Sequence, residues 1–100
     1  DAASVRLRAP ETHGVYFLYD RQGELINVGR AAGKGVTIRS RLLCHAEGKE
    51  GPCTKAASSF AFEETLFPKA REALHIFLFR IRHGRKPRCN EVAPSPPQSP

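Results

Sequence analysis

The chain has 100 residues, the size of one small domain, and its 40% hydrophobic content is enough for one modest core but argues against two independent domains. Its formal net charge is +6, and the positive charge is clustered. One cluster comprises Arg30, Lys34, Arg39 and Arg41, and a second comprises Arg80, Arg82, Arg85, Lys86 and Arg88. Clustered cations without intervening acids are typical of proteins that bind a phosphate backbone, although a solvated basic face has the same composition.

Two further classes are disfavoured by the sequence. No apolar run approaches the roughly 20 residues that span a bilayer, and no signal-peptide pattern is present, so we expect a soluble protein with no membrane partner. The three cysteines, Cys44, Cys53 and Cys89, are odd in number and form no C-x-x-C pair. We therefore expect neither a disulfide framework nor a standard zinc site, and we interpret them as reduced cysteines in an intracellular compartment, the cytoplasm, nucleoid or nucleus.

The first half of the chain predicts an arm, a hairpin and a helix. Residues 1–12 carry no strong pattern, and Pro10 argues against a continuous helix, so we interpret them as an entering arm. Two short apolar runs, 15–19 and 25–28, flank the sequence DRQG, which is typical of a turn in an antiparallel hairpin. The glycine-rich loop AAGKG then leads to Thr37, which we expect to cap a helix of about nine residues, IRSRLLCHA.

The second half predicts a loop, a strand and a longer helix. Residues 47–57 have the composition of a loop, and the alternation in SSFAFEE predicts a third, half-exposed strand. Pro68 suits the first turn of a helix that continues to Gly84, and its apolar density predicts that this helix is largely buried. The segment HIFLFRIR alone also fits a strand, and the proline-rich residues 93–100 predict a disordered tail or linker.

The expected order is therefore β-β-α-β-α, an α+β domain over residues 13–92 with a small three-stranded antiparallel sheet flanked by helices. The residues expected in its core are Val15, Phe17, Leu25, Val28, Ile38, Leu42, Phe60, Phe62, Leu74 and Leu78.

Several short motifs occur together in an order that resembles one enzyme family. GVY (14–16), ten intervening residues, NVG (27–29), the glycine-rich loop and IRSRLLCH (38–45) resemble the core of the GIY-YIG nuclease superfamily, which includes DNA repair and restriction enzymes. FAFEET, the long helix and KPRCN also fit this family, so the resemblance covers about residues 13–90. It implies a GIY-YIG-like fold and a metal-dependent endonuclease that acts on DNA, with RNA as an alternative substrate.

The resemblance also implies roles for particular residues. Tyr16 would orient or deprotonate the attacking water. To act as a base, Tyr16 would need a pKa below the ordinary tyrosine value near 10. Arg41 would stabilise charge on the phosphate, with His45 one helical turn away in the same site. Asn27 replaces the tyrosine of the second family motif, and its amide can bind a phosphate or water but cannot supply a proton as tyrosine does. The residues expected to bind substrate phosphates are Asn27, Arg30, Lys34 and Arg39.

Glu72 is the candidate for the glutamate that the family uses as a metal ligand. Counting back from KPRCN puts the family's position within residues 75–77, so either this helix has extra residues or the ligand is absent. Glu72 shares a helical stripe with Ile76 and Phe79, where a carboxylate is costly unless it is paired or bound to a metal. The alternative is that Glu72 complements the helix dipole or pairs with a nearby arginine.

The expected activity is hydrolysis of DNA phosphodiester bonds, selective for sequence or structure, with one Mg²⁺ or Mn²⁺ ion held by Glu72, waters and substrate. Two alternatives stay open: a catalytically degenerate nucleic-acid-binding module of the same fold, and a partner-binding adaptor with an incidental basic face. Because no recognition element is visible beyond this core, we expect specificity to come from a further domain, a partner or the substrate's shape.

Overall fold

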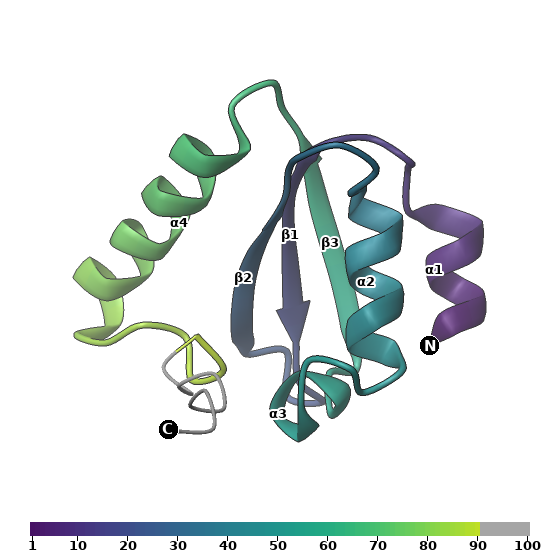
Figure 1. Cartoon of the computed structure of the whole chain (residues 1–100). Coiled ribbons are helices and arrows are strands. Elements are labelled where there is room, and N and C mark those ends of the chain that lie inside the picture. The colour runs from purple at the N-terminus through teal and green to yellow at the C-terminus, as the bar shows by residue number, and fades with distance from the viewer. Residues whose placement is uncertain (91–100) are drawn as a thin grey trace, which may run out of the picture.

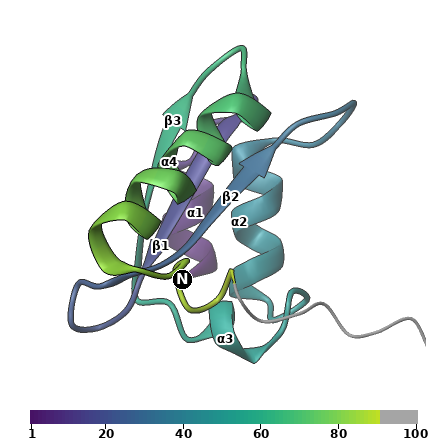
Figure 2. The ribbon, with the colours of Figure 1, turned by 90° about the vertical axis from the view of Figure 1, so that its left-hand side faces the viewer.

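The protein folds into one sheet with helices on both faces, as seen in a computed structural model that describes residues 1–90. Its elements are α1 (Ala2–Arg8), β1 (Gly14–Tyr19), β2 (Leu25–Ala31), α2 (Ile38–Ala46), α3 (Pro52–Lys55), β3 (Ser59–Glu64) and α4 (Pro68–His83). The strands form an antiparallel sheet in the order β2-β1-β3, with α4 on one face and α1 and α2 on the other (Figure 1, Figure 2). This confirms the predicted α+β class and three-stranded antiparallel sheet. The expected tail, 93–100, and the last residues of the expected domain, 91–92, lie outside the described residues.

The hairpin of β1 and β2 forms for the reasons that its sequence predicts. The Asp20 carboxylate accepts hydrogen bonds of 2.9 Å from the backbone N–H groups of Gln22 and Glu24. Gly23 has φ +79°, which residues with a side chain rarely adopt. The turn fixes the register that places Tyr16 of the central strand opposite Gly29 of the edge strand β2.

Helix α2 begins and ends where the sequence predicts. Thr37 forms a capping box with Ser40, in which each side chain accepts a hydrogen bond from the other residue's backbone N–H. Ile38 and Leu42, one turn apart, are buried against the sheet with exposed fractions of 0% and 2%. Arg41 and His45 lie on a neighbouring face of α2. The packing of Ile38 and Leu42 against the sheet therefore fixes the direction in which these two side chains point.

Helix α4 has the predicted bounds but not the predicted burial. It begins with Pro68 and ends before Gly84, which has φ +74°. Among the residues of α4 only Phe79 is buried, whereas Leu74 and Leu78, expected in the core, are exposed. A sheet of three strands is narrow, so it covers only one side of α4. The apolar side chains on the other side of the helix stay exposed to solvent. Of the other predicted core residues, Phe62 is also exposed, and Phe17, Leu25 and Phe60 are half-buried.

Two short helices were not expected from the sequence. Residues 1–12 contain α1, which the Asp1 side chain caps and which ends before Pro10. This segment packs against the domain, because Val5 belongs to the same buried core cluster as Leu42. The predicted loop 47–57 contains the single-turn helix α3, which begins at Pro52. Both are too short for a periodic signal, and tertiary packing stabilises them.

A membrane-crossing helix is not found in residues 1–90, where every helix is too short or too polar.

Candidate active site

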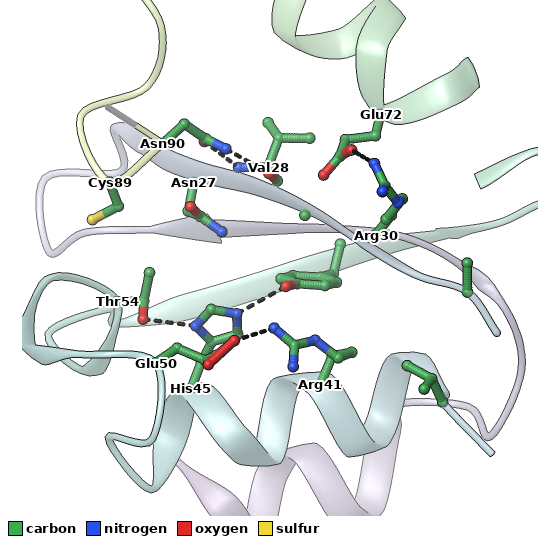
Figure 3. Close-up of a pocket in the computed structure, with 14 residues that line it drawn as sticks. Asn27, Val28, Arg30, Arg41, His45, Glu50, Thr54, Glu72, Cys89 and Asn90 are labelled. Carbon is green, nitrogen blue, oxygen red and sulfur yellow. Dashed lines mark hydrogen bonds and ion pairs between the residues drawn. The ribbon is translucent and has the colours of Figure 1, made fainter. Parts of the chain in front are cut away.

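A pocket of about 640 Å³ opens beside the edge strand β2 (Figure 3). Residues from β1, β2, α2, α3, α4 and the segment after α4 line it. The predicted site residues that line this pocket are Tyr16, Asn27, Arg30, Arg41, His45 and Glu72. Two predicted phosphate-binding residues lie elsewhere. Lys34 is exposed in the loop before α2, and Arg39 binds Glu11 and the carbonyl oxygen of Ala9.

A buried chain of three polar side chains crosses the floor of the pocket. The Tyr16 hydroxyl lies 2.8 Å from His45 Nε2, and His45 Nδ1 lies 2.6 Å from Thr54 Oγ1. The Tyr16 ring lies over Gly29, where a Cβ atom would come within 2.2 Å of the Tyr16 hydroxyl oxygen. The glycine of the NVG motif therefore makes room for the tyrosine of the GVY motif.

The surroundings of Tyr16 and His45 favour the neutral, hydrogen-bonded forms of both side chains over their charged forms. Burial, with the charge of Arg41 as a second cause, lowers the pKa of His45 to about 4, so the imidazole is neutral at pH 7. A neutral imidazole that donates from Nδ1 to Thr54 accepts from the Tyr16 hydroxyl at Nε2. Burial raises the pKa of Tyr16 above its ordinary value even though Arg41 acts against the rise. The fall in pKa that a tyrosine base requires is therefore not present, and Tyr16 is a neutral phenol.

Arg41 lies next to this chain and is paired with a residue that sequence reasoning missed. Its guanidinium forms an ion pair with Glu50, in the turn after α2. The hydrogen bond from Arg41 holds the pKa of Glu50 below its usual range. The sequence identified this segment only as a loop, and nothing in its composition marks Glu50 as the partner of Arg41.

Glu72 reaches the pocket from the other face of the sheet. Side chains alternate along β2, so Arg30 points toward α4 while its neighbour Gly29 lies under Tyr16. Arg30 Nη1 donates to Glu72 Oε1 at 2.7 Å, and the Glu72 side chain is 18% exposed. Of the interpretations considered for Glu72, pairing with a nearby arginine is the one that the structure contains. The carboxylate nevertheless lines the same pocket as Arg41 (Figure 3), and Tyr16 lines this pocket too.

The donors in this pocket do not form a closed metal cage. Within residues 1–90 no three histidine, cysteine or acidic side chains are grouped so that they could hold a metal ion. Mg²⁺ is commonly bound by one or two carboxylates, several waters and substrate phosphates. The Glu72 carboxylate fits an ion of this kind, shared with a substrate, and does not fit one that the protein holds alone.

The segment after α4 also contributes to the pocket. The side-chain amide of Asn90 accepts a hydrogen bond from the Val28 N–H and donates one to the Val28 carbonyl, both at 2.8 Å. The Cys89 N–H donates to the carbonyl of Ile26 at 2.8 Å. These contacts pair the free edge of β2 and close one side of the pocket. KPRCN contributed to the resemblance, but neither Asn90 nor Thr54 had a signal that predicted its contact.

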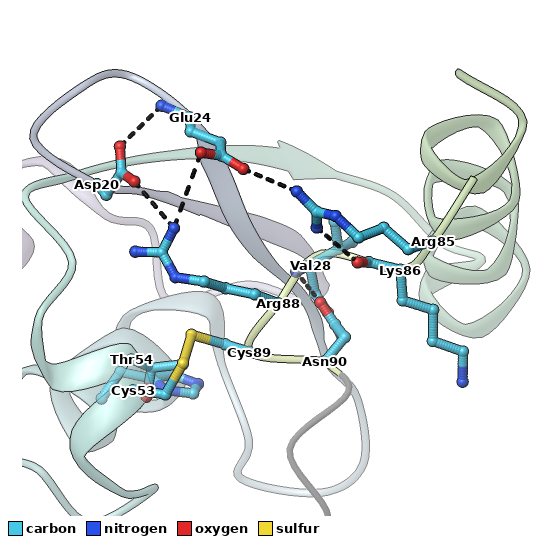
Figure 4. The surroundings of a disulfide bond; sticks show 11 residues. Asp20, Glu24, Val28, Cys53, Thr54, Arg85, Lys86, Arg88, Cys89 and Asn90 are labelled. Atoms are coloured by element: carbon cyan, nitrogen blue, oxygen red, sulfur yellow. Dashed lines mark hydrogen bonds and ion pairs between the residues drawn. A yellow bond between two sulfur atoms is a disulfide. The ribbon is translucent and has the colours of Figure 1, made fainter. Parts of the chain in front are cut away.

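Cys53 and Cys89 form a disulfide bond, so the prediction that the cysteines are reduced is wrong for these two (Figure 4). An odd count rules out complete pairing only, and the fold brings their Cα atoms to 5.7 Å, a distance that suits a disulfide. Cys44 is free. The bond joins the neighbours of Thr54 and Asn90, and thus two walls of the pocket. The prediction of a reducing compartment rested on unpaired cysteines, and this bond removes that support.

The second basic cluster is partly neutralised by the hairpin turn. Arg85 pairs with Glu24, and Arg88 pairs with Asp20 and Glu24 (Figure 4). Because Asp20 and Glu24 are distant from these arginines in sequence, the second basic cluster has no compensating acid nearby in the sequence.

Comparison of the chain with protein-family models and with curated proteins finds no match.

Proposed function

We propose that this chain is a GIY-YIG-like endonuclease domain that hydrolyses phosphodiester bonds of DNA. The proposal is supported by the convergence of Tyr16, Arg41, His45 and Glu72, from β1, α2 and α4, on one pocket beside Arg30. Phosphodiester hydrolysis needs an oriented attacking water, a cation for the phosphate and a carboxylate for a divalent ion. These four side chains are of the types that supply those functions.

Substrate phosphates take the place of two carboxylates that are paired with arginines in the free protein. Arg41 is held by Glu50 and Arg30 by Glu72, and all four side chains are partly exposed. Such pairs contribute about 0 to 1 kcal/mol each, so a phosphate that accepts both hydrogen bonds of a guanidinium can replace the carboxylate. When a phosphate binds Arg30, the Glu72 carboxylate becomes available to a cation.

A single Mg²⁺ or Mn²⁺ ion, held by Glu72 together with waters and substrate oxygens, fits this donor set. When bound, it neutralises the scissile phosphate and stabilises the charge of the leaving oxygen. Arg41 supplies a second positive charge from the opposite side of the pocket.

The buried chain of Tyr16, His45 and Thr54 orients the attacking water. When the Tyr16 hydroxyl donates to His45 Nε2 at 2.8 Å, its oxygen can accept a hydrogen bond from that water. Tyr16 and His45 both stay neutral, in agreement with the raised pKa of Tyr16 and the pKa of about 4 of His45, so the proton of the water passes to a substrate phosphate oxygen or to solvent. With Thr54 Oγ1 accepting from Nδ1–H, Nε2 is left as the acceptor for the phenol.

The test is cleavage of labelled duplex, branched and single-stranded DNA, and of single-stranded RNA, with Mg²⁺, with Mn²⁺ or with EDTA. We expect metal-dependent DNA cleavage that falls by about 100-fold or more in Arg41→Ala and in Glu72→Gln. Arg6→Ala, which removes the same charge from the exposed side of α1, is the control and keeps full activity. Activity that survives both pocket variants contradicts the site assignment.

A non-cleaving nucleic-acid-binding module is the second candidate. Asn27 in place of the family's tyrosine and the pairing of Glu72 with Arg30 favour it. A gel shift of intact DNA in the presence of Mg²⁺ would establish this candidate and reject the enzyme. Either candidate requires DNA binding that weakens as the salt concentration rises. If the protein does not bind DNA at all, the partner-binding adaptor is the alternative that is left.

A further inference from the structure

The solvent side of α4 carries an apolar stripe that the nuclease proposal does not use. Leu74, Phe77, Leu78 and Ile81 follow the spacing i, i+3, i+4, i+7 and have exposed fractions of 40%, 58%, 52% and 68%. We call these four residues the α4 stripe. Phe79 lies on the other side of the helix and is 8% exposed. Since α4 stands at the outside of the molecule, nothing within residues 1–90 covers the stripe (Figure 1, Figure 2).

A groove lies along one edge of the stripe. It has a volume of about 700 Å³ and lies between α4 and the turn that joins β1 to β2. Leu78 and Ile81 of the stripe line it together with Leu25 and Phe79. Glu24 also lines it, and this carboxylate is already paired with two arginines of the segment after α4. A helix packed beside α4 can place side chains in this groove while it covers the exposed stripe. Contiguous apolar surface of this kind on a small domain marks an interaction site.

The charges around the stripe select among possible occupants. Lys69, Arg80 and Arg82 lie on α4, are exposed, and have no acidic partner among residues 1–90. The helical period puts Arg80 and Arg82 on opposite flanks of the stripe. By contrast, Arg71 on the same helix is paired with Glu63. The uncompensated charge beside the stripe is therefore positive on both sides.

We propose that the α4 stripe and its groove bind an amphipathic helix of a partner protein, with an apolar face and acidic flanks. Such a helix covers the apolar side chains and pairs with Arg80 and Arg82 at once. The uncompensated charges on α4 of a second copy are also positive, so contact between two copies of the stripe would bring like charges together, which is unfavourable. Nucleic acid would meet the cations but would place hydrated phosphates over Phe77 and its neighbours, with no gain from apolar burial.

This surface is separate from the pocket that contains Glu72. The stripe faces away from the sheet, whereas Glu72 turns toward Arg30 on β2. A partner on the stripe therefore leaves the pocket open, so failure of the nuclease proposal does not bear on it.

The probe is a fluorescent 16-residue designed helix with leucine at i, i+3, i+4 and i+7 and glutamate on both flanks, titrated with the full chain by anisotropy. We expect saturable binding that weakens by about tenfold in Phe77→Ser and in Ile81→Ser. Leu7→Ser is the matched control, because Leu7 is 81% exposed on α1, and it should bind as the unmodified chain does. The double variant Arg80→Glu and Arg82→Glu should no longer bind the peptide with glutamate flanks and should bind a version with lysine flanks.

Four outcomes would overturn the proposal. Equal binding of the glutamate and lysine peptides would reject the charge argument. A dimer in sedimentation that Phe77→Ser abolishes would identify a second copy as the occupant. Binding to vesicles of phosphatidylcholine and phosphatidylglycerol without binding to the peptide would identify a lipid surface. Loss of DNA binding in Phe77→Ser would identify nucleic acid.

Discussion

Removal of the disulfide should cost the protein much of its stability. Cys53 and Cys89 are separated by 36 positions, so the bond closes a loop that contains β3 and α4. In the chain-entropy model a loop of that size restricts the unfolded chain by about 13 cal/mol/K, or about 4 kcal/mol at 25 °C. A small domain has a total stability of about 5 to 15 kcal/mol. The thermal midpoint should therefore fall by at least about 15 °C when the bond is absent.

The assay is urea and thermal unfolding, followed by circular dichroism, of the oxidised chain, the reduced chain and the double variant Cys53→Ser with Cys89→Ser. The reduced chain and the double variant should unfold alike, and a reductant should not change the double variant further. Cys44→Ser is the control, since Cys44 is free, and it should match the unmodified chain. Equal midpoints for oxidised and reduced protein would show that the bond does not stabilise the fold.

Three other perturbations follow from the pocket and its supporting helix. His45 has a pKa of about 4 when folded and about 6.5 when unfolded, so the unfolded chain binds the extra proton. Stability should be complete above about pH 6.5 and should fall by up to about 3 kcal/mol toward pH 4, measured by urea unfolding. Gly29→Ala puts a Cβ atom 2.2 Å from the Tyr16 hydroxyl, so it should cost about 1 to 3 kcal/mol in the same assay and impair cleavage. Thr37→Ala removes the cap of α2 and should cost about 1 kcal/mol.

The first two of these predictions have a control variant, and the third has an outcome that would contradict it. His45→Gln should remove the slope between pH 6.5 and pH 4.5, and an unchanged slope would mean that other groups cause it. Ala61→Ser adds one atom at an exposed position of β3 and should leave stability unchanged, unlike Gly29→Ala. A Thr37→Ala chain as stable as the original would mean that packing alone holds the start of α2.

The local structure of the chain could be predicted because its causes lie within a few residues of one another. The Asp20 turn, the Thr37 capping box and the Gly84 terminus are each formed by residues no more than four positions apart. Burial could not be predicted in this way. The apolar residues of α4 predicted a buried helix, but a three-stranded sheet covers only the stripe with Phe79. Helix α1 was missed because its stability comes from contacts such as those of Val5 with the core.

For the candidate site, the residue types and the strand or helix that carries each of Tyr16, Arg41, His45 and Glu72 could be predicted from the sequence. Their partners could not, since Glu50, Thr54 and Arg30 reach them through space from other elements. The fold also sets the directions of the pKa shifts of Tyr16 and His45, because burial depends on everything packed around a group. The Cys53–Cys89 bond has the same origin, because the fold alone brings these two thiols together.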